Sequence, residues 1–348
     1  MSIIKLDIYR LRCLEKVKLS LHHDFNFIYG PNGSGKTSIL EAISLLSSGK
    51  SFKTREASTL IKYKTEDLIL FAKTDSGKSV SMQKNTKGST VVRIDGQNCL
   101  NSSELARANP CQTFYQDIFQ ILDAGPQARR QLLDWGMFHV KHSYNSLLND
   151  YRHALKQRNA LLRQKAKKEF FVPWDEIIVN KAKEIDKLRA AYVFELNNKF
   201  QEIIGELIDF PCTIAYYRGW DRTNTGKDLA TILKEQFISD CKRQYTQYGI
   251  HNADLIIESS YNLAKKSLSR GEQKMVLVSI KLAQSLFLSN KCIYLFDDLT
   301  AELDERNVSK ILAYLRKLEG QKIITTPRLE LIGNMSANNY KIYDLGIN

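Results

Sequence analysis

A glycine-rich stretch near the N-terminus, GPNGSGKT, has the residue types and spacing of a phosphate-binding loop. It matches the pattern G-x-x-x-x-G-K-[ST] at every fixed position. Because glycine accepts backbone angles that other residues resist, the N–H groups of Gly33, Gly35 and Lys36 can surround a phosphate. Lys36 would reach the terminal phosphates of a nucleotide, and the Thr37 hydroxyl would ligate Mg²⁺. The residues predicted to bind ATP are Gly30, Pro31, Asn32, Gly33, Ser34, Gly35, Lys36 and Thr37.

Two adjacent acids far along the chain complete this chemistry. Asp297 and Asp298 follow the uncharged run CIYLF, which has the pattern of a buried strand. Asp297 is predicted to hold Mg²⁺ together with Thr37, and Asp298 to orient or deprotonate the attacking water. Lys36 and Asp298 are therefore the predicted catalytic residues. The structural alternative is that the two acids only cap a strand before a turn.

A third motif, LSRGEQK, has the spacing of a helix start. Ser269 and Glu272 stand three residues apart, as in the reciprocal cap that satisfies free backbone N–H groups. The simplest interpretation is that a helix begins here. The other is that the exposed N–H groups and the positive end of the helix dipole bind an anion. The candidate residues are Ser269, Arg270 and Gly271.

The elements that must position these motifs come from both ends of the chain. At the N-terminal end, the patterns predict strands at 3–11, 17–21 and 24–30, a helix from 36 to about 46, and short antiparallel strands between 66 and 96. At the C-terminal end, they predict a helix up to 288, a strand at 292–296, a helix near 305–318 and a strand at 322–326. We therefore expect an α/β class fold with a phosphate-loop core and an antiparallel β section.

The middle of the chain has a different character. Two long helical patterns, at 143–168 and 175–208, are joined by EFFVPW, where Pro173 breaks the helical period. Leu148, Leu155 and Leu162 share one stripe, so we expect a short antiparallel helical hairpin. The predicted domains are an ATPase head of residues 1–115 and 260–348, and an inserted, mainly helical domain of residues 116–259.

The motifs follow one another in a recognisable order: phosphate loop, serine-capped helix, two acids after a strand, then AELD from Ala301. In this order they resemble the ATP-binding-cassette ATPases of chromosome maintenance and repair, and among these the RecF family. The stretches LRCLEKVKLSL, LEAISLLSSGKSFKT, GPQARRQLLDWGMFH and YRHALKQRNALLRQ are also similar to that family. The resemblance therefore covers most of the chain.

The resemblance implies that Ser269, Arg270 and Gly271 contact the nucleotide of a second chain. ATP would then join two chains into a homodimer, and loss of the γ-phosphate would release them. It also implies a weak, DNA-stimulated ATPase that acts as a switch in replication, recombinational repair and the SOS response to DNA damage. RecO and RecR would be its partners in helping RecA to load at gaps. Asp298 stands where transporter ATPases carry glutamate, which favours slow hydrolysis, and Ala301 stands where the family commonly has serine.

The charge of the chain favours a polyanionic partner. Its 348 residues carry 51 Lys and Arg against 38 Asp and Glu, a formal net charge of +13. Between residues 152 and 168 there are basic residues and no acid. A solvated helix face is the simpler explanation, and a surface that follows DNA phosphates is the functional one. The candidates for contact with duplex, gapped or single-stranded DNA are Arg152, Lys156, Arg158 and Arg163.

The N-terminus and the cysteines indicate the compartment. The start MSIIKLDIYRL alternates charged and apolar residues instead of forming the apolar core of a signal peptide, and we find no apolar run of membrane-spanning length. The six cysteines have no metal-binding spacing, so we expect reduced, mostly buried thiols in a cytoplasmic protein without a membrane partner. Two alternatives stay open: the nucleotide-binding subunit of a transporter, and an armless chromosome-organising ATPase of the SMC type.

Overall fold

The chain folds into two compact units, described by a computed structural model for residues 2–54, 56, 58–99, 101–223, 225–260, 262–288, 292–327 and 339–346. The first unit is Met1–Ile118 with Leu288–Asn348, and the second is Phe119–Phe287. The chain returns to the first unit at Leu288, whereas the sequence predicted a return to the ATPase head at residue 260. Helix α10 (Arg270–Ser285) packs on α6 (Val172–Leu207), and this packing keeps residues 260–287 with the inserted unit.

The described part of the first unit contains a parallel sheet and an antiparallel sheet. The parallel sheet has the order β14-β3-β13-β12-β8, and all its neighbouring strands run parallel. The antiparallel sheet has the order β2-β1-β4-β5-β6-β7. The bounds of the parallel strands are β14 Tyr340–Asp344, β3 Phe25–Tyr29, β13 Gln321–Thr326, β12 Ile293–Phe296 and β8 Cys111–Phe114. Those of the antiparallel strands are β1 Ile3–Leu11, β2 Leu14–Ser20, β4 Asp67–Thr74, β5 Ser79–Asn85, β6 Thr90–Ile94 and β7 Gln97–Asn98.

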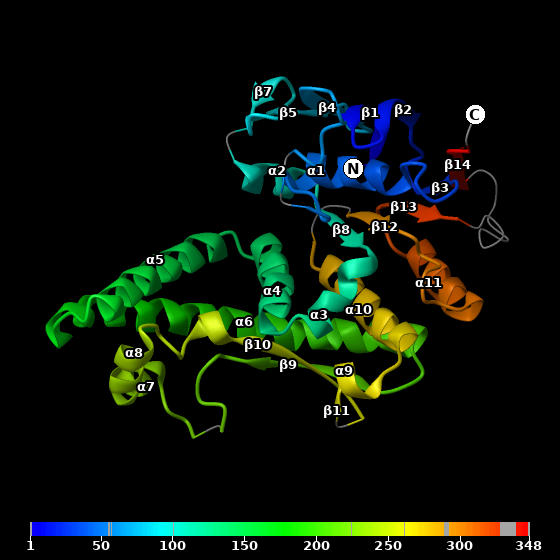
Figure 1. Ribbon diagram of the computed structural model, residues 1–348. Coiled ribbons are helices and arrows are strands. Elements are labelled where there is room, and N and C mark those ends of the chain that lie inside the picture. The colour runs from blue at the N-terminus through cyan, green and yellow to red at the C-terminus, as the bar shows by residue number, and fades with distance from the viewer. Residues whose placement is uncertain are drawn as a thin grey trace. The chain divides into compact units, whose positions relative to one another are not determined.

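Helix α1 (Lys36–Ser48) lies between these two sheets (Figure 1). Its apolar residues, among them Ile39 and Ile43, share one buried cluster with Leu6 of β1, Leu70 of β4 and Ile323 of β13. Burial of this apolar area is the main contribution to holding the unit together. Helix α2 (Ser102–Ala108) packs on α1, and α11 (Glu305–Lys317) connects β12 to β13. The helix and strands predicted from both ends of the chain are confirmed, whereas β8 and β14 were not predicted.

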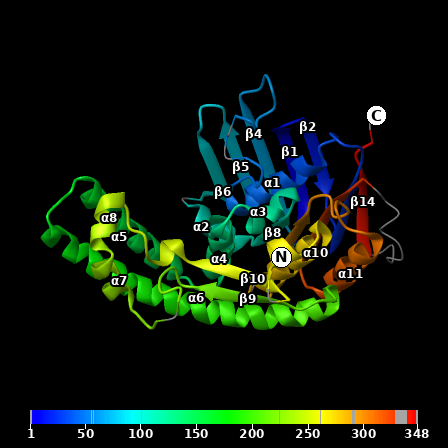
Figure 2. The same ribbon diagram turned by 60° about the horizontal axis from the view of Figure 1, so that its bottom comes forward.

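The second unit is built around a long helical hairpin. Helices α5 (Tyr144–Arg163) and α6 run side by side, and β9 (Cys212–Tyr217) lies along α6 (Figure 2). Strand β9 pairs with β10 (Asp254–Ser259), which pairs with β11 (Asn262–Leu263), in a small antiparallel sheet that was not predicted. The remaining helices are α3 Gln120–Asp123, α4 Pro126–Val140, α7 Leu229–Glu235, α8 Phe237–Arg243 and α9 Ala264–Ser267, and the 3₁₀ turns are η1 Gln116–Phe119, η2 Lys168–Phe171 and η3 Ile250–Asn252.

The predicted hairpin is confirmed, but its break lies earlier than Pro173. This proline occupies the first turn of α6, where its missing N–H removes no intrahelical hydrogen bond. The helical period is interrupted between Gln164 and Lys167 instead. The predicted stripe is also incomplete, because Leu155 is only half-buried while Tyr151 and Ala154 are buried.

Buried arginines join the helices of this unit. Arg158 is fully buried, and its guanidinium donates to Asp175 Oδ1 of α6 at 2.6 Å and to Asp240 Oδ2 of α8 at 2.7 Å. The prediction that Arg158 contacts DNA is therefore wrong. A cation with no exposed surface and two carboxylate partners is not available to a phosphate, because removing it would leave a buried charge unpaired.

The cysteines are free thiols, as predicted. Only Cys212 and Cys292 are buried, while Cys13 is exposed and the others are half-buried. The expectation that most of them are buried is therefore wrong.

Replacing Arg158 with alanine should destabilise the protein strongly. The Asp240 side chain is 1% exposed and would lose its cationic partner, a change that typically costs about 3–5 kcal/mol. Arg163→Ala removes an exposed cation of the same helix and should stay within about 0.5 kcal/mol of the wild type. Urea unfolding of both variants measures the difference. Equal midpoints would show that the buried ion pair does not stabilise the unit.

Candidate nucleotide site

The glycine loop connects the end of β3 to the start of α1. Gly33 and Gly35 have φ of 85° and 95°, in the left-handed region that favours glycine. A Cβ atom on Gly35 would lie 2.4 Å from Leu14 Cδ2, whereas one on Gly33 would meet nothing within 4 Å. Both positions therefore require the left-handed backbone that glycine allows, and Gly35 requires glycine for close packing as well.

This loop has the chemistry expected of an anion site. The first N–H groups of α1 have no partner within the helix, and the described structure places no side-chain cap on Gly35 and no acid in the first turn. The buried hydroxyl of Ser34 also has no hydrogen-bond partner in the described structure. Backbone donors, a positive helix end and an unpartnered hydroxyl all fit a phosphate group.

Lys36 lies close against the loop that precedes it. Its ammonium donates to the carbonyl oxygens of Gly30 at 2.6 Å and Pro31 at 2.9 Å, and the residue is only 9% exposed. The charge is thus held at the loop itself and does not extend into solvent. From this place the side chain can reach a phosphate bound by the loop.

Thr37 and Asp297 meet at the carboxyl ends of the parallel strands. Thr37 Oγ1 lies 2.8 Å from Asp297 Oδ1 and 3.1 Å from Oδ2. Neighbouring ligands of an octahedral Mg²⁺ at 2.0–2.1 Å lie about 2.9 Å apart, so this spacing fits the ion. The described residues contain no cluster of three or more His, Cys, Asp or Glu for a metal. A hydroxyl, one carboxylate and phosphate oxygens would be the ligand set, which is the usual one for Mg²⁺ beside a nucleotide.

Asp298 is fixed next to Asp297 by Thr325, a residue of β13. Thr325 Oγ1 donates to Asp297 Oδ1 at 3.1 Å and accepts from the Asp298 N–H at 2.8 Å. The Asp298 carboxylate accepts from Thr300 Oγ1 at 2.9 Å, and its backbone has a φ of 50°. Thr325 was not among the predicted catalytic or nucleotide-binding residues, although its position at the end of a core strand was a usable signal.

The serine-capped helix belongs to the second unit. The reciprocal cap is present: Ser269 Oγ accepts from Glu272 N, and the Glu272 carboxylate accepts from Ser269 N at 2.8 Å. Arg270 donates to Asp123 Oδ2 at 2.8 Å and lies 4.9 Å from the centre of the Phe119 ring. The hydrogen bond from this guanidinium lowers the pKa of the Asp123 carboxyl. Ser269 and Arg270 are exposed and Gly271 is half-buried, so the start of α10 is accessible.

The basic residues proposed for DNA lie mostly on the surface of α5. Lys156 and Arg163 are exposed, and the exposed Arg152 lies 3.3 Å from Asp134. Three of the four predicted contacts are thus available to a polyanion, and Arg158 is not.

In the described part of the chain, every helix is too short or too polar to cross a membrane.

Comparison with known proteins places this fold in one class. Residues 2–345 match the family model described as the RecF/RecN/SMC N terminal domain. A solved structure described as the recombination mediator protein RecF-ATP in the RecFOR pathway has a TM-score of 0.82 at 24% identity, covering 96% of this chain and 93% of that chain. An Smc head bound to the C-terminal domain of ScpA from Pyrococcus furiosus gives a TM-score of 0.60 at 19% identity, covering 99% of this chain and 93% of that chain. The fold is that of the RecF and SMC head domains, which confirms the predicted fold class.

The sequence relatives narrow the class to one family. The chain is 35% identical to the DNA replication and repair protein RecF of Pseudomonas syringae pv. syringae, over 93% of this chain and 90% of the relative. It is 33% identical to the RecF protein of Edwardsiella ictaluri, over 99% and 98%. The chain belongs to the RecF family of DNA replication and repair proteins.

Two alanine substitutions in the loop should separate packing from backbone strain. In Gly33→Ala the new Cβ atom lies in open space. The free energy of unfolding should therefore fall only by the cost of the left-handed conformation, about 1–2 kcal/mol. Gly35→Ala has the same strain and must also displace Leu14, a buried core residue, which adds about 1–3 kcal/mol. Urea unfolding without nucleotide measures both variants. A Gly33 variant as unstable as the Gly35 variant would contradict this assignment.

Proposed function

We propose that the protein is an ATP-dependent DNA-binding protein of replication and recombinational repair, in which a weak ATPase acts as a switch. The observation that supports this most is the contact between Thr37 and Asp297 beside the glycine loop. A loop of backbone donors, a hydroxyl and a carboxylate at one sheet edge match the needs of a nucleotide triphosphate with Mg²⁺. Membership of the RecF family adds the DNA and the repair context.

In this proposal the residues of the first unit bind and hydrolyse ATP. The loop from Gly30 to Thr37 holds the phosphates, and the Lys36 ammonium neutralises the terminal ones. Thr37 and Asp297 hold Mg²⁺. The Asp298 carboxylate orients or deprotonates the attacking water. Because aspartate is shorter than glutamate, its reach to the water is poorer, and we propose that turnover is slow.

The start of α10 is proposed to bind the nucleotide of a second chain. Ser269, Arg270 and Gly271 are accessible on their own unit, and the helix start attracts an anion. ATP would then bridge two chains, and hydrolysis would separate them. The proposed ATPase head of residues 1–115 and 260–348 would then include helix α10, although α10 folds with the second compact unit.

DNA is proposed to bind through backbone charge. The exposed cations Arg152, Lys156 and Arg163 would contact phosphates with little sequence preference. By analogy with the solved RecF structure of the RecFOR pathway, RecO and RecR would be partners that support the loading of RecA at gaps. The family match and the relatives favour DNA replication and repair over the nucleotide-binding subunit of a transporter.

The dimer is tested by light scattering with Mg²⁺ and ATP, on an Asp298→Asn background that slows hydrolysis. The background protein should double in mass when ATP saturates it. Ser269→Arg should keep it monomeric with nucleotide affinity unchanged, because the new side chain blocks only the second chain's ligand. Lys36→Ala should lose both nucleotide and dimer.

Ser267→Arg is the matched control, since Ser267 is exposed two residues before the cap. It should dimerise like the background protein. A monomer under saturating ATP, or a Ser269→Arg dimer of normal affinity, would contradict the switch.

The DNA surface is tested by the salt dependence of binding. Removing Arg152, Lys156 and Arg163 together should lower the slope of log K against log salt by about 0.9 per lost phosphate contact. A triple alanine variant of Lys16, Lys18 and Lys87, all exposed on the first unit, changes the net charge equally. Fluorescence anisotropy on gapped, single-stranded and duplex DNA should show a smaller slope for the first variant only. Identical slopes would remove α5 from the DNA interface.

A further inference from the structure

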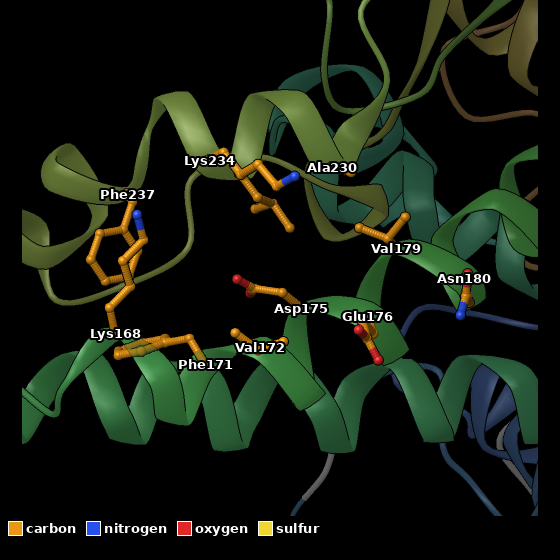
Figure 3. Close-up of a pocket in the computed structure, with 11 residues that line it drawn as sticks. Lys168, Phe171, Val172, Asp175, Glu176, Val179, Asn180, Ala230, Lys234 and Phe237 are labelled. Carbon is orange, nitrogen blue, oxygen red and sulfur yellow. The ribbon is translucent and has the colours of Figure 1, made fainter.

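The closed end of the helical hairpin contains a pocket that the nucleotide and DNA functions do not use. It lies between the start of α6, η2 and the helices α7 and α8, and has a volume of about 350 Å³ (Figure 3). This is at the lower end of the range of small ligand pockets, about 300–1,000 Å³. Its apolar lining consists of Phe171, Val172, Val179, Ala230, Leu233 and Phe237.

Contacts between the walls of the pocket hold them at a fixed spacing. Phe171 and Phe237 pack edge to face with ring centres 5.1 Å apart. Arg158 binds Asp175 in the pocket wall and also Asp240, three residues after Phe237. The ion pairs therefore set the spacing between α6 and α8, and the pocket is formed without a ligand to shape it.

Apolar side chains are exposed around this pocket. Phe170 is 60% exposed, Val172 53% and Ile238 70%, although each is next to or part of the lining. Val172 belongs to the lining itself, whereas Phe170 and Ile238 adjoin the lining residues Phe171 and Phe237 in sequence. An exposed apolar group at a pocket favours an interaction site. A partner seated on the pocket would bury Val172 together with the aromatic end of the pocket.

The charges around the pocket indicate the chemistry of that partner. Lys168 and Lys234 line it, and Figure 3 shows the Lys168 amine beside the Phe237 ring, at 5.6 Å from the ring centre. Further exposed cations on the same segments are Lys165, Lys167, Lys242 and Arg243. The lining also holds two acids, of which Asp175 is paired with Arg158 and Glu176 is exposed. Over residues 165–176 and 230–243, six exposed cations stand against three exposed acids, Glu169, Glu176 and Glu235. The rim therefore attracts negative charge while the floor takes an apolar group.

We propose that this pocket binds a large apolar side chain, aromatic by preference, carried by an acidic peptide segment of another protein. An aromatic ring would pack on Phe171 and Phe237, and flanking carboxylates would meet the lysines at the rim. Nucleic acid fits less well, because the side chains of Phe171, Leu233 and Phe237 in the pocket lining offer no donors to phosphate oxygens. This function goes beyond ATP-dependent DNA binding and does not depend on it.

The probe is a labelled synthetic peptide with a central tryptophan between pairs of aspartates, followed by fluorescence anisotropy on the full chain at low salt. Ala230→Trp fills the pocket from its own wall and should weaken binding at least about tenfold. Ala190→Trp places the same side chain on the exposed face of α6 and should bind normally. Nucleotide affinity of both variants should equal that of the wild type, which shows that the proposed nucleotide site of the first unit is intact.

A second pair of variants tests the rim without touching the pocket floor. Lys168→Glu with Lys234→Glu should weaken the peptide about tenfold and reduce its salt dependence, because two favourable charges are reversed. Lys16→Glu with Lys18→Glu, at exposed sites of the first unit, should not. A peptide with central alanine should bind at least about tenfold more weakly to the wild type.

Four results would overturn the proposal. One is the absence of binding, up to millimolar concentration, by aspartate peptides with central tryptophan, phenylalanine, leucine or methionine. Another is equal binding to the wild type and to Ala230→Trp. Equally tight binding of uncharged N-acetyltryptophanamide would assign the pocket to a small aromatic ligand. Loss of single-stranded DNA affinity in Ala230→Trp, without loss of peptide, would assign it to nucleic acid.

Discussion

The contact between Thr37 and Asp297 depends on the parallel sheet more than on either residue. The two side chains meet at 2.8 Å although 260 positions separate them in sequence. They meet because β3, β13 and β12 run parallel, so that the loop after β3 and the acids after β12 leave the sheet at the same edge. Thr325, near the end of the strand between them, fixes the acids by bonding Asp297 Oδ1 and the Asp298 N–H. A shift in strand register would separate the hydroxyl from the carboxylate and so remove the proposed Mg²⁺ site beside the glycine loop.

Local patterns predicted the elements that carry this edge, because their signals are contained in short windows. The loop, the capped helix and the apolar strand before Asp297 each depend on residues within a few positions of one another. The small sheet of the second unit was missed for the opposite reason. Strand β9 pairs with β10 although Tyr217 and Asp254 are far apart in sequence, and no local pattern specifies such a partner.

Arg158 shows a second limit of sequence reasoning. It belongs to a run of basic residues on α5, and a cation in such a run is usually solvated. Its burial follows from Asp175 and Asp240, which come from other helices and are recognisable as its partners only in the folded unit. The domain boundary shifted for a related reason: helix α10 carries a motif of the head but packs on α6. Motif order predicts function in this chain better than it predicts which part folds with which.

If the start of α10 binds a nucleotide as proposed, its cap would also set a selectivity threshold. Ser269 Oγ donates to the Glu272 carboxylate at 2.7 Å, so an internal anion already occupies the hydroxyl that an incoming ligand would use. Chloride or free inorganic phosphate must compete with this tethered carboxylate and gains little else in return. A triphosphate anchored on a neighbouring chain brings several further contacts at once and has a high effective concentration. In the proposed site, Glu272 would thus compete with weak anions and make the cap insensitive to ordinary cellular salts.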